Sequence, residues 1–165
     1  MNIDYGPVFG ELLQIERLRA LDEGSPDEAN RDRLQSLSVD EAFAHAKVVD
    51  TDNARCCLSA MWLLYDFLDD SHTLSQSIET IEGSFWHGIM HRREGDFSNA
   101  KYWFRKVGSH PVYELLAADF DPFDFVDACQ SALHNGGAEA DRCRQLQQRE
   151  WELLFDYCYR QALRE

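Results

Sequence analysis

Apolar residues recur at intervals of three and four along most of the chain, the spacing that places side chains on one face of an α-helix. No stretch alternates apolar and polar residues with the period of two that a half-buried strand shows. The pattern therefore predicts an all-α protein, a single compact bundle of about seven to eight helices. We expect these helices over residues 8–22, 26–37, 53–79, 85–94, 98–107, 111–118, 122–134 and 138–163.

Capping and turn residues separate the expected helices. Ser25-Pro26-Asp27-Glu28 combines an N-cap, a proline at the first helical position and a capping-box glutamate. Gly95-Asp96 predicts a tight turn between two helices, and Asn135-Gly136-Gly137 ends the helix before the last one. These signals predict that neighbouring helices are joined by short connections.

The whole chain, residues 1–165, has the length of one domain with a sizeable core. No apolar run approaches the roughly eighteen residues of a membrane span. The first residues are acidic and lack the basic start and apolar centre of a secretory signal, so we expect a cytoplasmic protein. The cysteines, five in number and without a Cys-x-x-Cys pair, are expected to be buried reduced thiols.

Sixteen basic and thirty acidic residues give a formal net charge of −14, which disfavours binding to nucleic acids and to anionic membranes. Between His87 and His110 the balance of charge reverses, because basic residues outnumber acidic ones. This positive region could attract an anionic small molecule, or its cations could pair with acidic helices of the protein itself. The charged residues of this region are Arg92, Arg93, Lys101, Arg105 and Lys106 against Glu94 and Asp96.

The centre of the chain, residues 54–111, is the part that we expect to carry a site. It contains four of the six histidines. At a turn of about 100° per residue, Asp69, His72 and Gln76 share one face of the long central helix. Because that helix is apolar on its other side, we expect burial on both sides, where a carboxylate and an imidazole need partners. Asp69 and His72 can supply two groups to one ligand, and Gln76 is a candidate ligand contact.

His87, His91 and Glu94 share a face of the following helix, at spacings of four and three. The spacing His-x-x-x-His lets two imidazoles meet one metal ion, although Gly88 replaces the glutamate that zinc proteases have after the first histidine. If the two helices form an antiparallel pair joined by a short loop at residues 81–83, His72 or Asp69 would complete a histidine-carboxylate ligand set with His87 and His91. Neutral imidazole and carboxylate suit zinc, iron or manganese. The predicted ligands of such a divalent metal are His72, His87, His91 and Asp69.

The same residues also allow a site without a metal. His72 or His91 would then act as general base, oriented by Asp69 or Glu94, because imidazole titrates near neutrality. Arginines could hold a carboxylate or phosphate in bidentate fashion. The structural alternative is that each histidine only bonds a carboxylate or a backbone carbonyl. The candidate anion-binding residues are Arg92, Arg93 and Arg105.

Tyr102, Trp103 and Phe104 are consecutive, so they cannot all face one interior. As core residues they would pack their helix on its neighbours, which is the usual role of aromatic residues at helical spacing. As part of a site, Tyr102 or Trp103 would stack on a ligand ring, with Arg105 nearby.

One segment resembles a single tetratricopeptide-like helical hairpin. The resemblance implies an antiparallel helix pair with close approach at a small residue, and it covers one repeat, whereas stable solenoids need several. The stretch HGIMHRREGDFSNAKYW is also similar to a family of uncharacterised, all-helical bacterial proteins, a similarity that implies no activity. The residues that carry the hairpin resemblance are Gly88, Gly95-Asp96-Phe97, Ala100, Phe104, Val107 and Pro111.

Two functional hypotheses follow. The first is a small-molecule enzyme or binder that uses the His/Asp/Glu cluster, with or without a divalent metal, and arginines that select an anionic ligand. The second is a non-catalytic, tetratricopeptide-like interaction module whose histidines and arginines form a buried structural network. A homo-oligomer is compatible with either hypothesis.

Overall fold

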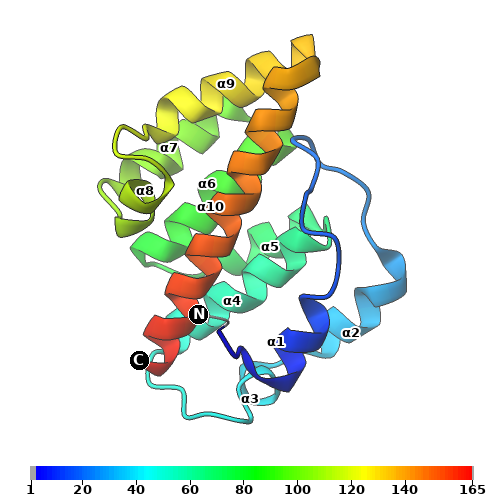
Figure 1. Cartoon of the computed structure of the whole chain (residues 1–165). Helices are drawn as coiled ribbons and strands as arrows, with labels where there is room; N and C mark the ends of the chain where they lie inside the picture. Colours follow the sequence, from blue (N-terminus) through cyan, green and yellow to red (C-terminus); the bar gives the residue numbers. More distant parts are fainter. Residues whose placement is uncertain (1–2, 165) are drawn as a thin grey trace.

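The computed structural model of the chain is shown in Figure 1, and its description covers residues 3–164. These residues form ten α-helices and one 3₁₀ helix, with no strand among them, so the prediction of a compact all-α bundle is confirmed. The helices are α1 (Gly6–Leu12), η1 (Glu28–Asn30), α2 (Arg31–Ser36), α3 (Val39–Ala42), α4 (Thr51–Leu64), α5 (Leu68–Ser75), α6 (Ile81–Glu94), α7 (Phe97–Val107), α8 (Pro111–Leu116), α9 (Pro122–Asn135) and α10 (Gly137–Leu163).

Helix α10 is the longest, and it packs against α4, α8 and α9 (Figure 1). Helix α6 lies in the middle of the bundle, where it contacts α4, α5 and α7. Its side chains are buried almost all round, from Gly83 to Arg93. A helix enclosed in this way has to bury its polar residues too, so each of them needs a partner inside the protein.

Helices α6 and α7 form a closely packed pair joined by the Gly95-Asp96 turn. Gly95 has a φ of 85°, a left-handed conformation that favours glycine, and Asp96 caps α7 by accepting the backbone N–H of Asn99 at 3.1 Å. At Gly88 a β-carbon would lie 3.0 Å from ring atoms of Phe104. The glycine therefore allows the two helices to approach closely.

The predicted helix over residues 53–79 is broken in the structure. Helix α4 ends at Leu64 and α5 begins at Leu68, with Asp66 between them at a φ of 64°. The Asp66 carboxylate accepts hydrogen bonds from Arg19, from Arg93 at 2.7 Å and from the backbone N–H of Ser25 at 3.1 Å. These distant groups stabilise a conformation that an aspartate rarely adopts, and they bend the chain at this point.

The predicted helix over residues 8–22 is also wrong beyond its first third, since α1 ends at Leu12. Four carbonyl groups of the segment that follows accept hydrogen bonds from side chains instead of from helical N–H groups, among them that of Glu16, to which Arg19 donates. Arg17 donates to Leu13, Gln147 donates to Ala20 at 2.9 Å, and Arg93 donates to Asp22 at 3.0 Å. Two of these donors lie far away in the sequence, which is why local spacing did not reveal the break.

The expected loop at residues 81–83 is the first turn of α6. The Thr80 side chain accepts the backbone N–H of Gly83 at 3.1 Å, so α6 starts at Ile81, four residues before the predicted start at residue 85. All five cysteines are buried free thiols, as expected. None of the helices formed by residues 3–164 combines the length and hydrophobicity needed to cross a bilayer.

Candidate metal centre

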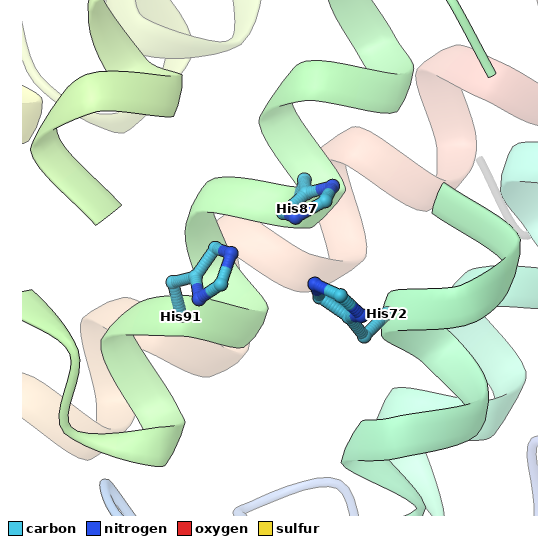
Figure 2. Close-up of side chains that lie close together, drawn as sticks. All are labelled: His72, His87 and His91. Atoms are coloured by element: carbon cyan, nitrogen blue, oxygen red, sulfur yellow. The ribbon is translucent and has the colours of Figure 1, made fainter. Parts of the chain in front are cut away.

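Three histidines from two helices point toward one another in the middle of the bundle (Figure 2). His72 comes from α5, and His87 and His91 come from consecutive turns of α6. One ring nitrogen of each lies within 4.8 Å of the others. The ring centroids are 4.6 Å apart for His72 and His87, 4.6 Å for His87 and His91, and 5.2 Å for His72 and His91. The structure therefore brings together three of the four predicted metal ligands.

These spacings are close to those of a metal site. Bonds of about 2.1 Å to a tetrahedral ion place the ligand nitrogens about 3.4 Å apart, so small side-chain rotations would close the set around an ion. His87 and His91 are 2% and 4% exposed, and His72 is half-buried. The approach to the cluster is consequently from the His72 side.

His91 is held by two polar neighbours. Its Nδ1 lies 2.5 Å from Oε1 of Glu94, and its Nε2 lies 3.2 Å from the side-chain nitrogen of Asn99. A carboxylate only accepts, so we assign the ring proton to Nδ1, and Nε2 then accepts from the Asn99 amide. A carboxylate bonded to the far nitrogen of a histidine is the usual support of a metal-bound imidazole.

His87 has no such support. It stacks on the indole of Trp103 with centroids 3.9 Å apart and planes 18° apart, and its buried Nδ1 has no hydrogen-bond partner. Burial, followed by electrostatic repulsion from His91, His72 and Lys106, lowers the pKa of His87 from 6.5 to about 3. The ring is therefore neutral at physiological pH, with a lone pair available for a ligand.

Asp69, the fourth predicted ligand, lies outside the three-histidine cluster. It is exposed on α5, and together with Glu94, Asp70 and Arg31 it lines a surface cavity of about 220 Å³. Gln76 lies on the other side of His72 and lines a separate cavity of about 540 Å³. The cluster therefore lies between two surface cavities, and only the first is rich in carboxylates.

Two of the three candidate anion-binding arginines are engaged within the protein. Arg92 is fully buried and pairs with Glu150 through contacts of 2.6 and 3.2 Å, and Arg93 pairs with Asp66 at 2.7 Å. Burial, the largest single influence, lowers the pKa of Arg92, but the charge and hydrogen bond of Glu150, together with the nearby Cys129 and Tyr113, outweigh it and raise that pKa. Of the two explanations offered for the positive region, intramolecular pairing describes Arg92 and Arg93. Arg105 is exposed on α7.

The three consecutive aromatic residues of α7 have three different environments. Phe104 is in the core, Trp103 packs on His87, and Tyr102 is 46% exposed. Core packing is therefore correct for Phe104 and wrong for Tyr102. Trp103 stacks on His87 of the histidine cluster, and its stacking on a ligand ring stays a prediction.

Asn99 was not predicted from the sequence to be a site residue, and Lys106 was named only among the cations of the positive region. With Trp103 they occupy positions i, i+4 and i+7 of α7, which form one helical face. Asn99 bonds His91, Trp103 packs on His87, and the Lys106 ammonium lies 4.3 Å from the centre of the Trp103 ring. The spacing of these residues from Trp103 is the signal that could have found them.

Comparisons with known proteins add no relative. No protein-family model, no curated protein and no solved structure matches the chain. The geometry of the site is accordingly the basis for a functional proposal.

Proposed function

We propose that His72, His87 and His91 bind a divalent transition metal, and that the protein is an enzyme or binder for a small anionic molecule at this centre. The observation that carries the proposal is the convergence of three imidazoles, one of which keeps a buried nitrogen without any partner. A buried polar atom without a hydrogen bond is costly unless something else binds it. A metal ion would bind that nitrogen.

The donor set favours a particular kind of metal site. Three neutral imidazoles suit zinc and iron, with manganese a weaker match because it prefers oxygen ligands. Three protein ligands leave a fourth position for water or substrate, as in catalytic rather than structural zinc sites. The metal would lower the pKa of a water molecule bound in that fourth position and would polarise a substrate oxygen bound there. Glu94 would keep His91 in the tautomer that binds the ion.

A second candidate function is the interaction module without chemistry. The buried ion pairs Arg92–Glu150 and Arg93–Asp66 support it, because they form the buried structural network which that hypothesis requires. The close packing of α6 on α7 at Gly88 is also compatible with a tetratricopeptide-like hairpin. The unpartnered His87 nitrogen is the feature that it leaves without a role.

We also propose a cytoplasmic location. Five free thiols suit a reducing compartment, since disulfides form and persist in oxidising ones. Such a compartment would also keep the buried cysteines from oxidation.

Metal analysis of the purified protein tests the proposal. After incubation with zinc, iron or manganese and removal of free ion, we expect about one ion per chain, as in a three-ligand site. The double variant His87→Ala and His91→Ala should lose it, and His134→Ala, a histidine at the end of α9, should keep it. Far-UV circular dichroism checks that all variants remain helical. No ion in the wild-type protein, or equal loading of the double variant, would contradict the proposal.

A further inference from the structure

The cavity of about 540 Å³ next to the histidine cluster has the size of a small-molecule site. It is formed where α5 ends and α6 begins, and α7 closes it with Trp103 and Lys106. Trp103 is shared between the two features, because the same indole lines the cavity and stacks on His87. A molecule in this cavity would therefore adjoin the proposed metal centre.

Lys106 gives the cavity a cation that the protein does not neutralise. Among the ion pairs of the described residues, α7 contributes Lys101, which pairs with Asp127 at 2.6 Å, and Lys106 takes part in none. Its ammonium instead lies over two aromatic rings, 4.3 Å from Trp103 and 5.0 Å from Tyr102.

The indole of Trp103 links Lys106 to the histidine cluster. His87 occupies one face of the ring at 3.9 Å, which leaves no room there for an ammonium group. Lys106 therefore covers the opposite face, where the attraction of a cation for an aromatic ring holds it. An anion that pairs with Lys106 replaces the weak attraction between the ammonium and the ring by a stronger charge-assisted hydrogen bond.

The remaining lining combines the apolar side chains of Ile78 and Ile81 with polar groups. Gln76, Thr80 and Ser84 offer amide and hydroxyl groups, and Glu79 offers an acceptor. Such a lining matches the hydroxyl groups of a ligand, whereas an apolar body would leave these groups without partners. We propose that this cavity binds a small hydroxylated carboxylate, with Lys106 on its carboxylate and Gln76, Thr80 and Ser84 on its hydroxyl groups.

This inference rests on the proposed function in one respect, since it makes the cavity the substrate site of the metal centre. A cation held by the histidines would attract the same carboxylate, so the two sites should reinforce each other. The arginines expected from the sequence are not needed in this arrangement, because Arg92 and Arg93 pair within the protein.

Calorimetric titration with D-gluconate, and with D-glucitol as its uncharged counterpart, tests the inference. The metal-free wild-type protein should bind gluconate and not glucitol. Lys106→Gln should weaken binding at least about tenfold through loss of the charge-assisted bond, and Arg105→Gln, on the same helix but outside the cavity lining, should change it less than about threefold. Zinc loading should strengthen gluconate binding to the wild-type protein several-fold.

The two proposals can fail separately. Zinc bound with the expected stoichiometry but no gluconate binding, or equal binding by Lys106→Gln, would overturn the anion site and leave the metal centre standing. Gluconate binding that depends on Lys106 in a protein that takes up no metal would support the anion site and contradict the metal centre. Equal gluconate affinity with and without bound zinc would overturn the link between the two sites.

Discussion

Helix α6 carries two kinds of buried polar residue that differ in how they are satisfied. Arg92 and Arg93 point to α10 and to the end of α4, where each meets a buried carboxylate. His87 and His91 face α5 and α7, where they meet another histidine, an indole and an amide. The charges of both arginines are neutralised within the protein, although Nε of Arg92 has no hydrogen-bond partner. The buried Nδ1 of His87 also lacks a partner, and the rings that surround it carry no opposite charge.

The difference distinguishes buried polar groups that stabilise the fold from buried polar groups that can bind a ligand. Removing one partner of a buried ion pair leaves an unpaired charge. Such a pair therefore constrains the fold without offering a binding site. A cluster of neutral rings with an open lone pair costs stability in the free protein and recovers it when something binds. This is why the histidine cluster, and not Arg92 and Arg93, is the basis for the proposed function.

The largest predicted effect concerns the buried ion pair between Arg92 and Glu150. Glu150→Ala leaves the Arg92 guanidinium buried without its carboxylate, and we expect the free energy of unfolding to fall by about 3–5 kcal/mol. Denaturant titration measures it. Combining Glu150→Ala with Arg92→Met should restore much of the loss, because the uncompensated charge is then gone. A loss below about 1 kcal/mol for the single variant would show that the pair is not structural.

An intermediate effect concerns the pH dependence of the metal-free protein. The pKa of His87 falls from 6.5 in the unfolded chain to about 3 in the folded protein, so below pH 6.5 the unfolded chain binds a proton that the folded protein does not. Stability is therefore lost as the pH falls from 6.5 toward 3, by about 2 kcal/mol between pH 6.5 and 5. His87→Phe, which keeps a ring against Trp103, should lack this component. Parallel stability curves for both proteins would contradict the buried, neutral state of His87.

The smallest predicted effect concerns Asn99, whose amide donates to the His91 nitrogen that a metal would use. Binding of the ion has to break this hydrogen bond, which is worth about 1 kcal/mol. Asn99→Ala should therefore tighten zinc binding by about fivefold, as measured by competition with a chelator. Weaker binding would mean that Asn99 supports the metal-bound histidine instead of competing for it.

The helices that could be predicted from the sequence are those with local start and stop signals. Helices α7, α9 and α10 begin and end within a few residues of the prediction, because Asp96, Asp121 and the glycines at 136 and 137 act on the adjacent backbone. The break at Asp66 could not be predicted, because the groups that hold it come from Ser25, Arg19 and Arg93. Their positions depend on the tertiary structure.

In the candidate site, too, the features set by local spacing could be predicted from the sequence, and those set by distant partners could not. The spacing of His87 and His91 along one helix and the face of α5 that carries His72 were both visible in the sequence, and the structure brings these residues together. That Arg92 and Arg93 pair with Glu150 and Asp66 was not visible, because these partners lie on other helices or at a break that the sequence does not signal. The metal and the ligand remain proposals.

X-ray absorption at the zinc edge of the zinc-loaded protein is the most direct test of the central claim that the three histidines hold one ion. We predict the scattering of three imidazoles, with nitrogen at about 2.0–2.1 Å and one further light ligand. One imidazole should disappear in His72→Ala. A spectrum dominated by carboxylate and water oxygens, unchanged in that variant, would contradict the claim.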